Sequence, residues 1–155
     1  KVGYAIITKG FHGSSSAGLA ELISGGSNIE LIKAHLEPQL EHEFSQTIST
    51  LIKEPYAMMD TSDGLGDALF KIAQSSGVSI KVDYDKIPHL DLVTKEQVLF
   101  GGEDYKLVAA IPEKYISNIK GAVKIGSVEK SDCTLNISGY KYNNYSELNL
   151  YNHFG

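Results

Sequence analysis

Apolar positions along the chain switch between alternation, which is typical of strands, and a spacing of three to four residues, which is typical of helices. Leu65, Leu69, Ile72 and Ala73 show the helical spacing, and Gly77 stands just past the end of that segment. The pattern predicts strands at residues 3–8, 58–59, 78–84, 106–111, 123–128 and 133–138. It predicts helices at residues 17–23, 29–35, 43–53, 65–73, 94–100 and 112–119.

Prolines support several of the predicted helix boundaries. Pro38 separates two predicted helices and Pro55 ends the second of them, because proline lacks the amide hydrogen that a helix interior needs. Neighbouring β elements near the end favour an α/β (α+β) fold, with helices packed on a mixed sheet, over a purely parallel doubly wound fold. We expect a turn at residues 130–132 and an irregular, tyrosine-rich tail at 140–154.

Composition narrows the class of protein. A chain of 155 residues, 42% hydrophobic and 21% charged, matches one globular domain over residues 1–155. Fourteen basic residues, all lysine, against nineteen acidic ones give a net charge of -5, which argues against a nucleic-acid partner. The single cysteine cannot form an internal disulfide, which favours a reducing, cytoplasmic location. No apolar run reaches the roughly 20 residues that a membrane-spanning helix needs. Since Lys1 leads directly into a predicted strand, we expect the chain to belong to something longer.

The strongest candidate chemistry lies where the helix after Gly64 is predicted to begin, in the segment Asp60-Thr61-Ser62-Asp63. Magnesium prefers oxygen ligands and keeps several waters, so one or two carboxylates beside substrate phosphates form a typical site. The free amides and positive dipole of a helix start favour phosphate. Asp60 and Asp63 could therefore hold a metal ion while Ser62 contacts a nucleotide. Ser62 or Asp63 acting as a helix N-cap would explain the same residues without a ligand.

A second candidate, Gly101-Gly102-Glu103-Asp104-Tyr105, lies between a predicted helix and a predicted strand. Paired glycines permit a positive φ and close approach of a ligand, and the acids that follow could bind a cationic or hydrogen-bonding group. A helix C-cap followed by solvated acids explains the spacing without any ligand.

Both motifs occur together, in an order and at a separation that resemble one enzyme family. Residues 58–65, Met-Met-Asp-Thr-Ser-Asp-Gly-Leu, resemble the Met-x-Asp-x-Ser-Asp-Gly-Leu motif of thiamine-monophosphate kinases, and residues 101–105 resemble their Gly-Gly-Glu-Asp-Tyr motif. Segments 15–19, 35–38 and 151–154 agree as well. The Ser-Asp-Gly sequence of the first motif distinguishes this family from related ATP-using enzymes, whose sequences differ at that motif. These enzymes include aminoimidazole ribonucleotide synthetase, selenophosphate synthetase and a hydrogenase maturation protein.

The resemblance implies the C-terminal half of a two-domain enzyme, with a fold like the C-terminal domain of aminoimidazole ribonucleotide synthetase and without the N-terminal nucleotide-binding domain. It implies transfer of the γ-phosphoryl group of ATP to thiamine monophosphate, with Mg²⁺ as cofactor and a homodimer in the full-length form. By carry-over, Asp60 and Asp63 would bind magnesium, Ser62 would contact ATP, and Glu103 and Tyr151 would contact the thiamine substrate. No catalytic side chain is implied, and the isolated chain is expected to be nearly inactive.

Two other readings stay open: a non-catalytic binding or assembly module of the same fold, and another ATP-using member of the superfamily. Retention of both carboxylates and of Glu103 favours the kinase half. Four of the five histidines show no metal-ligand spacing and are predicted to be surface or packing residues: His12, His35, His42 and His89.

Overall fold

The computed structural model describes residues 1–130 and 132–148, which contain one seven-stranded sheet. Its strands lie in the order β2-β4-β1-β5-β3-β6-β7. Their bounds are β1 Ala5–Thr8, β2 Ala57–Asp60, β3 Ser79–Val82, β4 Leu107–Ile111, β5 Val123–Glu129, β6 Leu135–Ile137 and β7 Tyr140–Tyr142. Strands β3 and β6 pair in parallel and the other neighbours pair antiparallel, so the sheet is mixed, as predicted.

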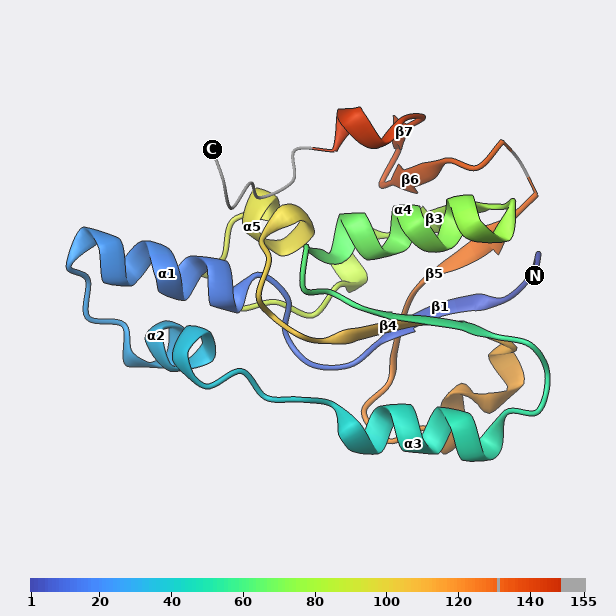
Figure 1. The fold of residues 1–155 in the computed structure, drawn as a ribbon, viewed down its shortest axis with the longest axis horizontal. Coiled ribbons are helices and arrows are strands. Elements are labelled where there is room, and N and C mark those ends of the chain that lie inside the picture. Colours follow the sequence, from blue (N-terminus) through green and yellow to red (C-terminus); the bar gives the residue numbers. More distant parts are fainter. Residues whose placement is uncertain (131, 149–155) are drawn as a thin grey trace.

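Helices cover the sheet on both faces. Figure 1 shows α4 on one side of the strands and α3 on the other, with α1 and α2 packed together near one end of the sheet. The α-helices are α1 Ser14–Ser24, α2 Ile29–Leu36, α3 His42–Leu51, α4 Leu65–Ser76 and α5 Lys95–Phe100. Three short 3₁₀ segments complete the described elements: η1 Tyr84–Lys86, η2 Glu113–Asn118 and η3 Tyr145–Glu147. The predicted arrangement of helices on a mixed sheet is therefore confirmed.

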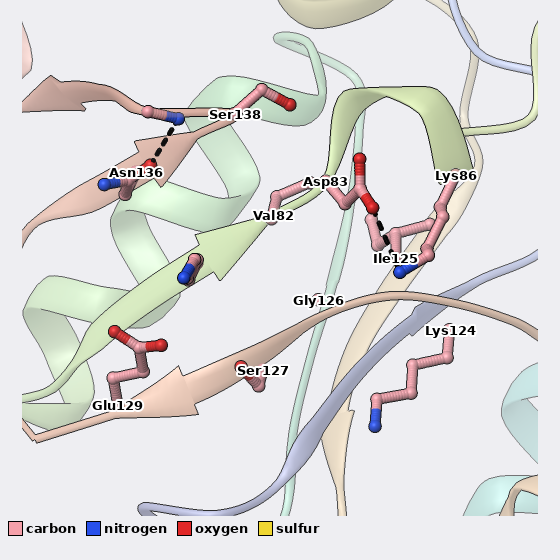
Figure 2. A pocket seen from close by; sticks show the side chains of 12 residues that line it. Val82, Asp83, Lys86, Lys124, Ile125, Gly126, Ser127, Glu129, Asn136 and Ser138 are labelled. Atoms are coloured by element: carbon pink, nitrogen blue, oxygen red, sulfur yellow. Dashed lines mark hydrogen bonds and ion pairs between the residues drawn. The ribbon is translucent and has the colours of Figure 1, made fainter.

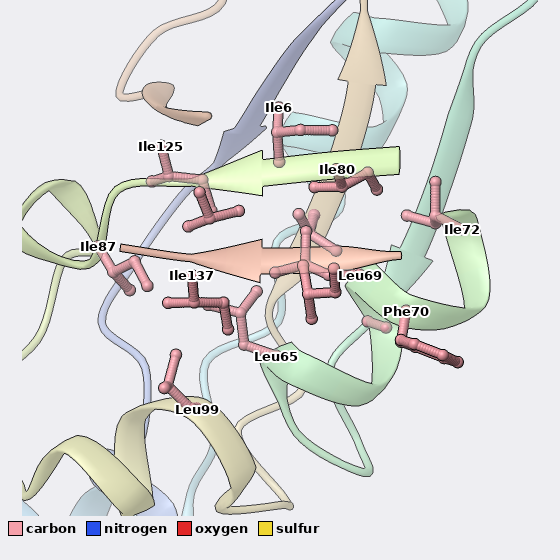
Figure 3. Packing of buried hydrophobic residues seen from close by; sticks show 14 of the residues in the cluster. Ile6, Leu65, Leu69, Phe70, Ile72, Ile80, Ile87, Leu99, Ile125 and Ile137 are labelled. Atoms are coloured by element: carbon pink, nitrogen blue, oxygen red, sulfur yellow. The ribbon is translucent and has the colours of Figure 1, made fainter. Parts of the chain in front are cut away.

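The apolar core consists of two clusters, one on each face of the sheet. Leu65 and Leu69 of α4 pack in the larger cluster with Ile6 and Ile80 of the strands (Figure 3). Ile7, the next residue along β1, belongs to the smaller cluster beneath α3. Successive strand side chains point to opposite faces, so a strand that is covered on both sides buries every residue. This explains why β1 reads as a continuous apolar run and is buried throughout.

On the face of the sheet that carries the smaller cluster, one region has polar side chains instead of apolar ones. Lys81 of β3 lies in register with Ser127 of β5 and Asn136 of β6, and Lys81 is exposed. These residues line an open hollow of about 790 Å³, whose rim also carries Lys86 and Lys124 (Figure 2). Alternation on these strands therefore separates an apolar face under α4 from a solvated one.

Three predicted elements need correction. The tail was expected to be irregular, but Tyr140–Tyr142 forms β7, because Tyr142 pairs with Leu135 and packs its ring against Phe100 at 5.9 Å. The strand predicted at 133–138 is confined to Leu135–Ile137, since φ is positive at Cys133, two residues before the strand, and at Ser138, directly after it. The helix predicted at 112–119 is the short 3₁₀ segment η2.

Truncating α4 in the core should weaken the fold strongly. Leu69 has no exposed surface, so Leu69→Ala leaves a cavity between α4 and the sheet and should lower the free energy of unfolding by about 2–5 kcal/mol. Leu92→Ala is the matched control, because Leu92 is 69% exposed and its loss should change stability by less than about 0.5 kcal/mol. Urea unfolding followed by circular dichroism measures both, and equal effects would contradict the assigned core.

Candidate functional site

The sheet brings the two sequence motifs together. Strand β2 ends at Asp60, and its antiparallel partner β4 begins at Leu107, so the loops that flank these residues leave the sheet at the same end. The Thr61 N–H donates to the carbonyl of Lys106 at 2.9 Å, and the Glu103 N–H donates to the carbonyl of Ser62 at 2.8 Å. Two backbone hydrogen bonds therefore join segments about 40 residues apart in sequence.

Glycines make this contact possible. A Cβ added to Gly102 would lie 2.6 Å from the carbonyl oxygen of Ser62, closer than real Cβ contacts allow. Gly64 adopts a φ of 103°, and an added Cβ there would press on the backbone of Phe100 at 3.1 Å. Both positions therefore require glycine, one for close approach and the other also for its left-handed conformation.

The carboxylates of the first motif point to solvent and do not cap the helix. Asp60 and Asp63 are both exposed, and the N-cap of α4 is Gly64, which makes no side-chain capping bond. The capping explanation offered by the sequence is therefore wrong for both Ser62 and Asp63. Between them, the hydroxyl of Thr61 is buried and has no hydrogen-bond partner among the described residues. A buried polar atom without a partner is unusual and marks the loop as more than a connection.

Two residues of the second motif adopt an uncommon backbone conformation. Glu103 has a φ of 68° and Tyr105 a φ of 50°, values that residues other than glycine rarely adopt. The Tyr105 hydroxyl donates to Glu103 Oε2 at 2.6 Å. That hydrogen bond and the charge of Glu103 raise the pKa of Tyr105, and the charges of Asp60 and Asp63 add to the effect. The carboxylates of both motifs thus act on the same small region.

Asp104 has a role that the sequence did not reveal. Its carboxylate is buried and accepts hydrogen bonds from the backbone N–H groups of Gly13 and Ser15, the latter at 2.9 Å. Burial raises the pKa of Asp104 to about 6, although the two amide donors oppose the shift. Asp104 therefore fixes the second motif to the start of α1. Neither its neighbours nor its spacing could have shown this, because its partners lie some 90 residues away.

The histidines behave as packing residues where the structure shows their partners. The Thr8 hydroxyl donates to the carbonyl of Leu107 at 2.8 Å, so the ring Nε2–H of His12 donates to that hydroxyl, also at 2.8 Å. Burial lowers the pKa of His12 to about 3, which keeps the ring neutral. His35 contacts the Ser15 hydroxyl at 2.9 Å.

The acidic side chains of the first motif are too few to form a complete metal site by themselves. Within residues 1–130 and 132–148, no group of three or more His, Cys, Asp or Glu side chains could hold a metal ion. Two exposed carboxylates on one loop nevertheless match what magnesium takes from protein when phosphates and water supply its other ligands. Tyr151, predicted to contact substrate, lies outside the described residues.

Comparison with known proteins decides the family. The model of the family described as "AIR synthase related protein, C-terminal domain" matches residues 3–131. The chain belongs to this family.

The relatives most similar in sequence include several thiamine-monophosphate kinases, the family that the two motifs resemble. The chain is 35% identical to a thiamine-monophosphate kinase of Prochlorococcus marinus over 71% of its length, and 31% identical to one of Aquifex aeolicus over 85%. It spans 39% and 47% of those proteins, so it corresponds to about half of such relatives. The predicted resemblance to thiamine-monophosphate kinases is therefore confirmed.

Solved structures agree on the fold. A structure of AaThiL complexed with AMPPCP and TMP superposes with a TM-score of 0.81 at 29% identity, covering 93% of this chain and 50% of that one. The hydrogenase maturation protein HypE of E. coli has a TM-score of 0.73 at 18% identity, covering 92% of this chain and 49% of that one, and shares the fold. The AIR synthase-like fold predicted from sequence is confirmed.

Protonation of Asp104 should stabilise the folded state. Because its folded pKa of about 6 lies above the ordinary 3.8, its contribution to stability is fully present below about pH 3.8 and is lost as the pH rises through 6. The free energy of unfolding of the wild type, relative to Asp104→Asn, should fall by about 2–3 kcal/mol between pH 4 and pH 7.

Urea unfolding across this pH range, together with carboxyl ¹³C NMR of Asp104, measures the effect. The exposed Asp91 is the control, and Asp91→Asn should leave the pH profile unchanged. A midpoint for Asp104 at or below 3.8 would show that the two amide donors outweigh burial.

Proposed function

We propose that this chain is the C-terminal half of an ATP- and magnesium-dependent kinase that converts thiamine monophosphate to thiamine diphosphate. The observation that carries the proposal is the junction of the two motif loops, where the Glu103 N–H meets the carbonyl of Ser62 and the carboxylates of Asp60 and Asp63 stay exposed. The similarity to AaThiL, whose structure holds AMPPCP and TMP, supports it.

The proposed roles follow the chemistry of each side chain. Asp60 and Asp63 supply hard oxygen ligands to Mg²⁺, which neutralises the phosphate charge when bound. The Ser62 hydroxyl contacts the nucleotide. Glu103, oriented by the Tyr105 hydroxyl, binds the thiamine moiety, and Tyr151 packs beside the substrate ring. Phosphoryl transfer asks little covalent help from protein, so positioning and charge neutralisation carry the catalysis.

The remaining half of the site comes, in this proposal, from an N-terminal nucleotide-binding domain that precedes residues 1–155 in a homodimeric, cytoplasmic enzyme. The chain matches about half the length of its relatives, which leaves room for such a domain. The described residues contain no helix with the length and apolar character needed to cross a membrane.

Removing either proposed metal ligand should abolish turnover without unfolding the protein. In the full-length protein, Asp60→Asn and Asp63→Asn should each lower kcat by at least about 100-fold, because a weakened metal site no longer neutralises the transferred phosphoryl group. Asp91→Asn removes one exposed carboxylate elsewhere and should keep full activity.

A coupled assay for ADP release measures turnover, and circular dichroism checks the fold. Unchanged turnover in both Asp60→Asn and Asp63→Asn would defeat their assignment as metal ligands, and no ADP release by the full-length wild type with thiamine monophosphate would defeat the kinase assignment. Calorimetry separates the alternative: a non-catalytic module should show no magnesium-dependent nucleotide binding even at full length.

A further inference from the structure

Lys71 of α4 bridges two acidic side chains of very different exposure. Its ammonium lies 2.7 Å from Asp67 Oδ2 and 3.3 Å from Asp63 Oδ2. The Asp67 side chain is 2% exposed, whereas that of Asp63 is 53% exposed. Residues 67 and 71 lie one helical turn apart, so Lys71 reaches back over the first turn of α4 toward the loop before it.

Asp67 is held from the other side as well. The Tyr145 hydroxyl, in η3, donates to Asp67 Oδ1 at 2.6 Å, so each carboxylate oxygen has a short partner. The Tyr145 ring also lies 6.0 Å from the ring of Phe70, which fixes η3 against α4. A buried acid held at both oxygens gives Lys71 a fixed anchor.

The Lys71 ammonium lies closer to Asp67 Oδ2, at 2.7 Å, than to Asp63 Oδ2, at 3.3 Å. Its attraction to Asp67 is therefore the stronger of the two. Two carboxylates share one ammonium, so the group as a whole keeps a negative charge that can attract a cation.

Asp63 uses one oxygen in this contact and leaves the other open. In the part of the chain that the structure describes, Oδ2 meets Lys71 and Oδ1 has no hydrogen-bond partner. A half-exposed aspartate without such a contact would exchange among staggered rotamers and would lose that freedom on binding a metal ion.

We propose that Lys71 is a positioning residue for Asp63, fixing Oδ2 and leaving Oδ1 to bind a metal ion, and that Tyr145 and Asp67 hold Lys71 in place. The part that concerns metal rests on the proposed function, whereas the part that concerns the rotamer stands on the contacts alone. Groups behind a metal ligand commonly orient it in this way, and their loss typically weakens metal binding by about 10- to 100-fold.

The rotamer can be tested on the 155-residue chain without metal. Three-bond couplings to Cγ of Asp63 should report one χ1 rotamer in the wild type and an average in Lys71→Gln. Lys81→Gln is the matched control, because it removes the same charge from an exposed lysine on β3, away from both motifs. Lys71→Arg should restore the single rotamer, and Tyr145→Phe should loosen it. A single rotamer in Lys71→Gln would overturn the inference.

Titration of the full-length protein with Mn²⁺ separates this inference from the proposed function. Paramagnetic broadening of the Gly64 amide should need about tenfold more Mn²⁺ in Lys71→Gln than in the wild type or Lys81→Gln. Equal concentrations for Lys71→Gln and the wild type would overturn the role of Lys71 in metal binding. No broadening in any variant, with the rotamer change intact, would count against the proposed metal site and would support the positioning of Asp63 alone.

Discussion

The hydrogen bond from the Glu103 N–H to the carbonyl of Ser62 is the constraint on which the site depends. It exists because β2 and β4 are neighbours, with Asp60 opposite Leu107, so the loops beyond them meet. Backbones can approach this closely only when one partner lacks a side chain, and Gly102 meets that need. This contact uses backbone atoms alone, so it does not involve the side chains of Ser62 and Glu103.

Glu103 and Asp104, the adjacent acids of the second motif, face in opposite directions. The positive φ of Glu103 and of Tyr105 turns the chain so that Glu103 stays partly exposed while Asp104 points inward to the start of α1. Such backbone conformations persist only when the surroundings hold them. The amides of Gly13 and Ser15 hold Asp104, and the Tyr105 hydroxyl holds Glu103, so the strain is stabilised from both sides.

Sequence reasoning succeeded where structure is local. The helical spacing after Gly64 predicted α4, because short patterns and turn residues act over a few positions. It failed for β7, because a strand of three residues is too short to show a periodic pattern and depends on the partners of Tyr142 in β6 and on Phe100. Asp104 was missed for the same reason, since a buried clamp and a solvated acid look alike until distant partners are known.

The first motif shows why half of a site can be stable alone. Asp60, Asp63 and Glu103 all raise the pKa of Tyr105, so three carboxylates act on one region and repel one another. Exposure to water screens that repulsion, and Lys71 offsets part of it at Asp63. A cavity closed over these acids would intensify their repulsion, because a low dielectric strengthens charge interactions. An open loop is therefore the stable form of these residues, and a magnesium ion of the kind proposed would offset their repulsion.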